Sequence, residues 1–397
     1  MSKPSKGNKA ITLLSVLIVL AVAAAIFVVF NSTAPQEAGD AFLQATYPQE
    51  EDVTEPITEP ETMPPELDDP EYSRRWDNEE LDALLDTRPR SQLTGLPINE
   101  EYLNRRPIAT VINNIHAALP QSGIAQADII YEVLAEGRIT RFVTIHQSQM
   151  PEMLGPVRST RNYFVDIALG HDAIFVHHGG SQTGYSQIRN TGATNLDGMQ
   201  LEGTVFWRDR TYPAWHFNTG TRPMEHSSFT SWERIQNHVT ARNIRDTTEF
   251  NFGLTFGVQP AGMEVSPANT IRVPFSDQYV RTFVFDPALG LYMVYNQHGP
   301  HQDGIDAQQL GVANVLVQLT SIRVVDNEGR RAVQTTGTGS GYFATGGNVV
   351  PVTWARENLS TALRWYYQDG TPLILTPGRT WVNIFQGTVE FDDEAAS

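Results

Sequence analysis

The order of apolar and polar positions divides the chain into three regions. Residues 11–30 form an uninterrupted apolar run, residues 31–89 have few apolar positions, and beyond residue 90 short apolar runs alternate with turn residues. A helix rises ~1.5 Å per residue, so about 20 apolar residues span ~30 Å, the thickness of a bilayer core. The pattern therefore predicts one transmembrane helix over residues 11–30.

The charges on either side of this run predict its orientation. Lys3, Lys6 and Lys9 precede it, whereas the residues after Phe30 are neutral and then acidic. The positive-inside rule therefore places residues 1–10 in the cytoplasm and the chain beyond the helix outside it. A cleaved signal peptide is the alternative, but it normally has a shorter apolar region of roughly 7–15 residues and a small-x-small site at its end. We expect a retained anchor in the cell membrane, although both interpretations export the rest of the chain.

The region between residues 31 and 89 is rich in Glu, Asp, Pro and Thr and contains little that a core could bury. Like charges repel along such a segment, and its prolines favour extended conformations. We expect a disordered spacer that holds the folded part away from the membrane. The stretch 77–86 within it has the pattern of one short amphipathic helix.

Residues 90–245 combine two hydrophobic periodicities. β-branched runs bounded by turn residues predict strands, and apolar positions three and four residues apart predict helices. The strands are expected at residues 108–115, 128–134, 141–146 and 173–178, and the helices at residues 158–170 and 231–242. This part is predicted to be a mixed α/β domain.

Residues 250–391 carry mostly strand-like runs. Residues 286–290 separate two such runs and predict a hairpin turn. The run Gly337–Gly341 lacks the lysine of a phosphate loop, so we interpret it as a flexible turn between strands. The predicted fold is α/β or α+β, with one transmembrane helix, an N-terminal mixed α/β part and a smaller, mostly antiparallel β part.

The composition excludes several classes of function. With a net charge of −17 the chain repels nucleic-acid phosphates, so no nucleic-acid partner is expected. The chain contains no cysteine, which excludes disulfides, thiolate catalysis and an acylated cysteine as a lipid anchor. His177, His178 and His216 do not follow a recognised ligand spacing, so we expect neither a metal nor a cofactor.

The densest group of polar residues lies between the end of one predicted strand and the start of the predicted helix at 158–170. A helix start offers free backbone amides and a partial positive charge, which suits an anion or a polar glycan. The alternative is that the arginines pair with nearby glutamates and only hold the helix on the sheet. The ligand-binding candidates are Glu136, Arg141, Arg158, Ser159, Arg161 and Ser181, and the catalytic candidates are Glu132 and His178.

A second group places aromatic rings among polar residues over residues 207–218. Aromatic rings pack on the faces of sugar rings while neighbouring polar groups bind hydroxyls, so the pattern is typical of a sugar-facing surface. The alternative is a capped turn beneath a hydrophobic cover. Arg208, His216 and Asn218 are the ligand-binding candidates here, and Asp209 is a catalytic candidate.

No complete catalytic arrangement is visible in the sequence. Glu132 and Glu136 would lie ~13 Å apart on an extended strand, too far to act as paired carboxylates unless the chain turns between them. Ser159 and Ser181 lie outside any Gly-x-Ser-x-Gly turn, which weakens the case for a serine hydrolase.

Several motifs occur together in an order that is found in a known family. They are Arg106–Asn114, Ala127–Glu132, Glu136-Gly137, Ile139–Phe142, Gly155–Arg161, His178–Ser181, Arg208-Asp209, His216 with Asn218, and Gly378–Val382. Through them the chain resembles the YerB-like lipoproteins, a bacterial envelope family with a two-part domain. The resemblance implies an N-terminal α/β part and a smaller C-terminal β part on the outer face of a membrane.

Two features depart from the pattern of that family. Typical members are held by a lipidated cysteine, whereas this chain has no cysteine and carries the apolar run at 11–30 instead. Where the family pattern has Pro-His-Asn, this chain has Trp215-His216-Phe217-Asn218. The resemblance therefore supports location and architecture more than a reaction.

Two functions remain open. The first is a non-catalytic cell-envelope module that binds a cell-wall glycan, a peptide or a protein partner near the membrane. The second is an enzyme that acts on a cell-wall polymer, with Glu132 or Asp209 as acid or base and the arginines holding a carboxylate or phosphate of the substrate. The lack of a complete catalytic arrangement favours the first.

Overall fold

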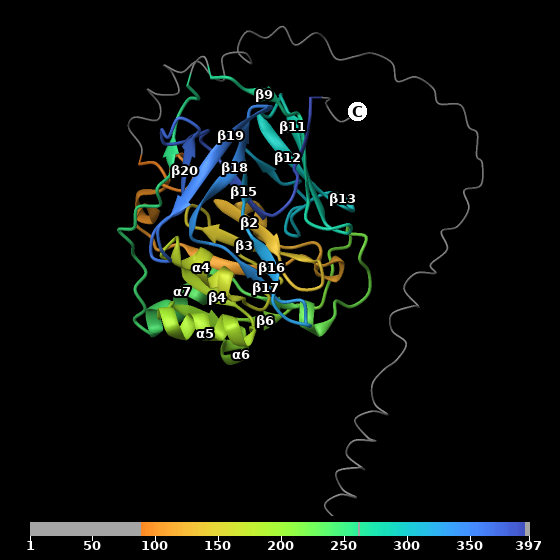
Figure 1. Cartoon of the computed structure of the whole chain (residues 1–397). Helices are drawn as coiled ribbons and strands as arrows, with labels where there is room; N and C mark the ends of the chain where they lie inside the picture. The colour runs from red at the N-terminus through yellow and green to blue at the C-terminus, as the bar shows by residue number, and fades with distance from the viewer. Residues whose placement is uncertain (1–88, 261–262, 394–397) are drawn as a thin grey trace, which may run out of the picture. The chain divides into compact units, whose positions relative to one another are not determined.

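The computed structural model describes residues 89–260 and 263–393, and its main element is a mixed sheet of 11 strands (Figure 1). The strand order is β20-β19-β18-β15-β22-β2-β3-β1-β4-β5, and the short β9 pairs with β19. The strands are β1 (Ile108–Asn113), β2 (Ile129–Leu134), β3 (Thr140–His146), β4 (Ile174–His177), β5 (Asn195–Asp197), β9 (Ser266–Pro267), β15 (Asn314–Leu319), β18 (Gly337–Thr345), β19 (Asn348–Arg356), β20 (Arg364–Tyr367) and β22 (Thr380–Phe385).

Strands β1, β2 and β3 of this sheet are buried along their whole length. Continuous β-branched runs such as that of β1 are typical of strands covered on both faces, which is why the sequence pattern located them. The strands expected at residues 108–115, 128–134, 141–146 and 173–178 are confirmed, each within two residues at either end.

Strand β22 joins the two halves of the chain. It lies parallel to both β15 and β2, so that Val382 pairs with Leu316 on one side and with Tyr131 on the other. The β-rich range 250–391 therefore supplies strands to the same sheet as the range 90–245.

A second sheet of six strands is antiparallel throughout, in the order β13-β12-β11-β10-β23 with β14 paired to β12. Its apolar face shares a core with the central sheet, where Trp381 of β22 lies 5.3 Å from the ring of Phe142 and 5.8 Å from that of Phe283. The predicted hairpin at 286–290 joins β11 to β12 and is confirmed. The strands are β10 (Thr270–Pro274), β11 (Val280–Asp286), β12 (Leu291–Asn296), β13 (Gly299–Pro300), β14 (Gly311–Val312) and β23 (Glu390–Asp392).

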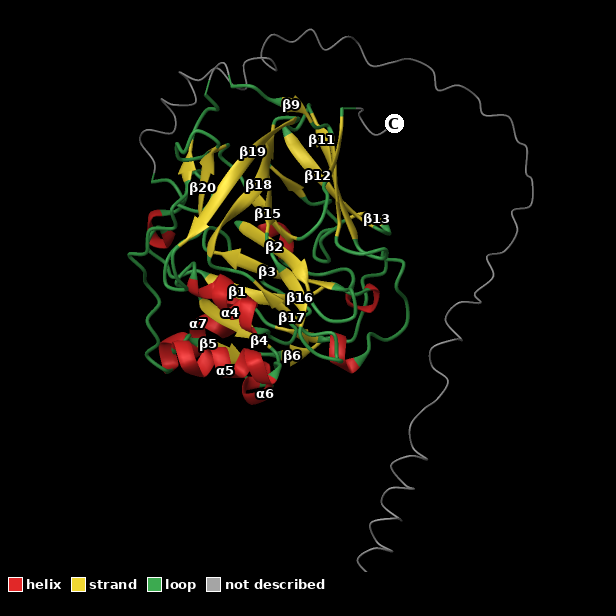
Figure 2. Ribbon diagram, viewed as in Figure 1, coloured by secondary structure: helices red, strands yellow, loops and turns green. Residues whose placement is uncertain are grey.

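The α-helices of the described region gather at the β4–β5 end of the central sheet (Figure 2). Consecutive residues of β4 face different helices. Phe175 packs in the core that contains Phe164 of α4, and Val176 packs in the core that contains Ile235 of α7. The helices are α4 (Asn162–Leu169), α5 (Gln182–Thr191), α6 (Gly198–Leu201) and α7 (Trp232–Ala241), so the helix expected at 231–242 is confirmed.

The remaining elements are short. Three two-stranded ribbons are formed by β6 (Trp207–Arg208) with β7 (Ser228–Phe229), β8 (Thr255–Phe256) with β21 (Ile374–Leu375), and β16 (Ile322–Val324) with β17 (Arg331–Val333). Single 3₁₀ turns are η2 (Glu100–Tyr102), η3 (His116–Ala118), η4 (Ile124–Gln126) and η5 (Met224–His226).

Two local expectations were wrong. The helix expected at 158–170 begins only at Asn162, because the preceding segment is extended and pairs with its neighbours: Arg158 N donates to Val111 O over 2.8 Å, and His178 N donates to Arg158 O over 3.0 Å. The run Gly337–Gly341 is the first half of strand β18 rather than a flexible turn. Close packing requires glycine at position 339, since a Cβ there would lie 2.6 Å from the ring of Trp354.

Within residues 89–260 and 263–393, no helix is both long enough and apolar enough to cross a bilayer. The predicted transmembrane helix at 11–30, the predicted spacer and the short helix expected at 77–86 lie outside the described residues.

Candidate functional site

Four arginines from three separate segments of the chain lie together beside the ends of β1, β2 and β4. Arg141 is the second residue of β3, Arg158 and Arg161 belong to the extended segment before α4, and Arg208 lies in β6. We call Arg141, Arg158, Arg161 and Arg208 the arginine cluster. The backbone pairs described above, together with Thr160 N donating to Gly179 O over 2.9 Å, bring the extended segment to the end of β4.

The centre of the cluster is Arg141, whose side chain is only 6% exposed. It donates to Ser159 O over 2.7 Å and to Glu136 Oε2 over 3.3 Å, and Glu136 also accepts from Arg161. Burial and the neighbouring charge of Arg161 lower the pKa of Arg141 to about 9. Burial opposes ionisation of Glu136, but the hydrogen bond from Arg161 and the charge of Arg141 leave its pKa below the ordinary value. The Nε atom of Arg141 is buried and has no hydrogen-bond partner among the described residues.

His178 connects Arg208 to the rest of the cluster. Arg208 donates from Nη2 to His178 Nε2 over 3.0 Å, so the opposite nitrogen, Nδ1, carries the proton and donates to Ser228 Oγ over 2.7 Å. Burial and the charge of Arg208 lower the pKa of His178, which keeps the ring neutral. Ser159 Oγ donates to the carbonyl oxygen of His178 over 3.1 Å. His178 therefore orients Arg208, and neither ring nitrogen is free to act as a base.

The cluster has more positive than negative charge although the whole chain is acidic, with a net charge of −17. Arg158 uses one guanidinium nitrogen to donate to Glu225 O over 2.9 Å, and Arg208 pairs with Glu202 over 2.7 Å. The four guanidinium groups thus face three carboxylates, those of Glu136, Glu202 and Glu225. Guanidinium forks bind carboxylate and phosphate oxygens in pairs of short hydrogen bonds, so this arrangement suits an anionic ligand.

The structure separates three other sequence candidates from the cluster. Glu132 is 1% exposed and pairs with Arg281 in the interface between the two sheets. Ser181 caps α5 by accepting a hydrogen bond from Gly184 N over 3.1 Å. Asp209 caps a turn, where it accepts from the backbone nitrogen of Thr211 over 2.9 Å.

His216 and Asn218 lie in a different place, beside a small cavity of about 190 Å³ that we call the aromatic pocket. Phe217 is the centre of its rings, with centroid distances of 3.9 Å to His216, 5.0 Å to His116 and 5.5 Å to His298. Asn218 Nδ2 donates to His116 O over 2.8 Å and so holds this loop against η3. The lining includes Leu119, Pro120, Trp215, His216, Phe217, Asn296, His298 and Gln302.

The group predicted over residues 207–218 is therefore divided between two sites. Arg208 joins the arginine cluster, and residues 215–217 form one wall of the aromatic pocket. Sequence reasoning missed Arg281, His116 and His298, because each contacts a residue in a segment about 80 or more residues away and no local motif marks it.

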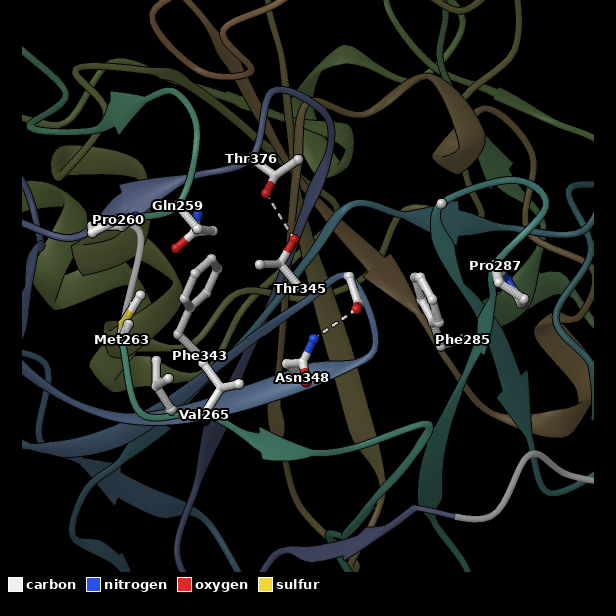
Figure 3. Close-up of a pocket in the computed structure, with 13 residues that line it drawn as sticks. Gln259, Pro260, Met263, Val265, Phe285, Pro287, Phe343, Thr345, Asn348 and Thr376 are labelled. Carbon is white, nitrogen blue, oxygen red and sulfur yellow. Dashed lines mark hydrogen bonds between the residues drawn. The ribbon is translucent and has the colours of Figure 1, made fainter. Parts of the chain in front are cut away.

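A larger cavity of about 430 Å³ was also missed (Figure 3). Its walls are mostly apolar and come from the β11–β12 hairpin, from β18 and β19, and from the chain around Met263. Polar side chains at its edge bond to the protein itself: Thr345 Oγ1 donates to Thr376 Oγ1 over 2.8 Å, and Asn348 donates to Gly346 O over 3.0 Å. The cavity suits an uncharged apolar group.

Among residues 89–260 and 263–393, no group of three or more His, Asp or Glu side chains has a geometry that could hold a metal ion.

Comparison with known proteins relates the chain to one family. Residues 93–245 match the family described as "Protein of unknown function (DUF3048) N-terminal domain", and residues 271–382 match the corresponding C-terminal domain. The Bacillus subtilis (strain 168) protein named "Putative lipoprotein YerB" is 34% identical over 315 residues, which are 77% of this chain and 89% of that protein. The crystal structure of the YerB protein from Bacillus subtilis is similar with a TM-score of 0.67 at 32% identity, covering 76% of this chain and 99% of that one.

Proposed function

The chain belongs to the DUF3048 family, as its resemblance to the YerB-like lipoproteins predicted, and from this premise we propose that it is an envelope protein that binds an anionic cell-wall polymer at the arginine cluster. In this proposal the apolar run at 11–30 crosses the membrane once, residues 1–10 are cytoplasmic, and the described region lies outside the cytoplasm.

One observation carries the proposal: an acidic protein concentrates four arginines against three carboxylates within the described region. Arg158 is half-buried and the side chain of Arg208 is 23% exposed, so their guanidinium groups are within reach of a ligand oxygen. A carboxylate or a phosphate of the polymer supplies that oxygen.

Two observations support the location. The sequence has the length, the apolar character and the flanking lysines of a single membrane anchor. The Bacillus subtilis relative is named as a lipoprotein, and this chain has no cysteine that a lipid could modify. A helix at 11–30 holds the chain at the same surface by another route.

Binding is favoured over cleavage because the carboxylates near the cluster already have partners. Glu136 pairs with Arg141 and Arg161, and Glu132 is enclosed between the sheets with Arg281. A general acid needs a carboxyl group whose pKa is raised and which reaches the substrate. Glu136 has the opposite shift, a lowered pKa.

The proposal is tested by equilibrium binding with the full-length chain in detergent micelles. Two soluble polymers distinguish the source of the anion: peptidoglycan fragments carry carboxylates, and a poly(glycerol phosphate) carries phosphates. At low salt we expect one of them to bind, and we expect Arg158→Gln/Arg208→Gln to weaken that binding at least tenfold. Binding should also weaken as salt rises.

The matched control is Arg189→Gln/Arg242→Gln, which removes the same charge from exposed arginines of α5 and of the loop after α7. It should bind like the wild type. Arg158→Gln alone guards against misfolding, since the side chain of Arg158 makes a hydrogen bond only to Glu225 O within the described region. If the folded variants bind both polymers as the wild type does, or if the wild type binds neither, the proposal is wrong.

A further inference from the structure

Two aromatic rings at the rim of the aromatic pocket are exposed although their loop is fixed. Trp215 is 42% exposed and Phe217 is 53% exposed. The loop that carries them is held by hydrogen bonds, from Tyr212 Oη to Ala117 O over 2.8 Å and from Asn218 Nδ2 to Leu119 O over 3.0 Å. These hydrogen bonds, rather than packing of the two rings, hold the loop in place. Burying the exposed rings against an apolar surface of a ligand would therefore be favourable.

The polar groups of the pocket are available for a ligand. The ring nitrogens of His298, the Nδ2 atom of Asn296 and the Oε1 atom of Gln302 make no hydrogen bond to another described residue, whereas Asn296 Oδ1 and Gln302 Nε2 are used by the protein. None of the described residues that line the pocket is Asp, Glu, Lys or Arg. The pocket thus offers both donors and acceptors but no formal charge.

The volume limits the ligand further. At about 190 Å³ the pocket is smaller than the ~300–1,000 Å³ that holds a drug-sized molecule, so it accepts a single ring rather than a large ligand. A sugar ring has an apolar face that packs on an aromatic ring and hydroxyl groups at its edge that need both donors and acceptors. A neutral sugar matches each of these features.

The aromatic pocket lies close to the arginine cluster. Asn113 at the end of β1 pairs in register with Arg141, and its Nδ2 atom lies 2.9 Å from His226 Nδ1. His116, which contacts Phe217, follows only three residues later, so its Cα is at most about 11 Å from that of Asn113. The two sites therefore contact neighbouring parts of one short segment, as a short oligosaccharide that occupies both sites requires.

We propose that the aromatic pocket binds a neutral sugar ring of the same wall glycan whose anionic group is held by the arginine cluster. The inference rests on the function proposed above and names its ligand more closely: a glycan in which a neutral ring and a carboxylate or phosphate are adjacent.

The test uses the full-length chain in micelles and a neutral probe, the tetramer of N-acetylglucosamine. Binding is measured by calorimetry and by the fluorescence of the tryptophans. We expect the wild type to bind the tetramer, Trp215→Ala/Phe217→Ala to bind it at least tenfold more weakly, and Arg158→Gln/Arg208→Gln to bind it as the wild type does. The matched control is Leu289→Ala/Val324→Ala, which removes two exposed apolar side chains, 53% and 56% exposed, from other parts of the surface.

Two results overturn the inference: a wild type that does not bind the tetramer, or a folded Trp215→Ala/Phe217→Ala variant that binds it undiminished. If the anionic polymer still binds through the arginines in the same preparation, only the sugar pocket is wrong and the proposed function stands. If the tetramer binds through the aromatic rings but the anionic polymer does not bind, the pocket is a sugar site, and the arginine proposal is wrong together with the claim that one glycan occupies both sites.

Discussion

Arg281 of β11 donates two hydrogen bonds to Glu132 of β2, over 2.7 Å from Nε to Oε2 and over 3.1 Å from Nη2 to Oε1. The two side chains are 2% and 1% exposed. Glu132 also accepts from Thr140 Oγ1 over 2.7 Å, and Arg281 lies 2.8 Å from His301 Nδ1. This ion pair joins the second sheet to the central sheet and gives Glu132 a structural role.

Removing the charge of Glu132 should therefore destabilise the fold. Glu132→Gln leaves the guanidinium of Arg281 buried without its counter-charge, and breaking a buried pair in this way costs about 3–5 kcal/mol. The free energy of unfolding, measured by urea denaturation, should fall by that amount. The control Glu328→Gln removes an exposed partner of Arg330 and should cost less than about 1 kcal/mol. Equal stability of the two variants would contradict the structural role.

His146 should make stability depend on pH. Burial lowers the pKa of His146 to about 4 from the ordinary 6.5, so between these values the unfolded chain binds more protons and stability falls as the pH falls. Between pH 6.5 and pH 5 one such group contributes about 2 kcal/mol. Gln at this position keeps a donor for Gly123 O, which His146 contacts over 3.0 Å, but does not titrate.

The measurement is chemical denaturation of wild type and His146→Gln at pH 7 and at pH 5. The loss of unfolding free energy between the two pH values should be about 2 kcal/mol smaller in the variant. Because the other titrating groups contribute equally to both losses, their contribution cancels when the loss of the variant is subtracted from that of the wild type. Identical losses of unfolding free energy in both proteins would show that His146 does not contribute to the dependence of stability on pH.

Gly341 should tolerate no side chain. A Cβ there would lie 2.2 Å from the carbonyl oxygen of Val317 on the paired strand β15, so Gly341→Ala forces the strands apart. The expected cost is about 1–3 kcal/mol, seen as a lower melting temperature. Gly257→Ala is the control, because its Cβ would meet Ile374 at an ordinary 3.4 Å. A melting temperature unchanged in both variants would mean that β18 does not pack as described.

The topology proposal predicts a pattern of protection from protease. In cells whose wall is permeable to the enzyme, protease added outside should digest the region after residue 30, while a tag placed before Lys3 should remain. A protected C-terminal region would contradict the proposed location and the wall-polymer function with it.

Much of the fold was predictable because its signals are local. The β-branched run of β1 and the turn between β11 and β12 each specify their own conformation, and both were located from the pattern alone. Strand β18 was misinterpreted because Gly339 and Gly341 are needed for contacts with paired strands, with the ring of Trp354 and the carbonyl oxygen of Val317, and no local pattern shows these contacts. The extended chain before α4 was misinterpreted because pairing with β1 overrides its helical pattern.

The site was predictable in part for the same reason. Arg141, Arg158 and Arg161 stand in one dense stretch of polar residues, and the structure brings them together with Arg208. The partner of Glu132 is 149 residues away, and no pattern near Glu132 distinguishes a buried structural carboxylate from an exposed one. Which sequence candidates would touch a ligand therefore depended on contacts between distant segments.

Binding at the arginine cluster is tested most directly by a crystal structure of the chain with a soluble anionic fragment of the wall polymer. We expect a carboxylate or phosphate oxygen of the fragment to lie about 2.7–2.9 Å from guanidinium nitrogens of the arginine cluster. A fragment bound elsewhere, with Arg158 and Arg208 still bonded only to protein groups, would contradict this expectation.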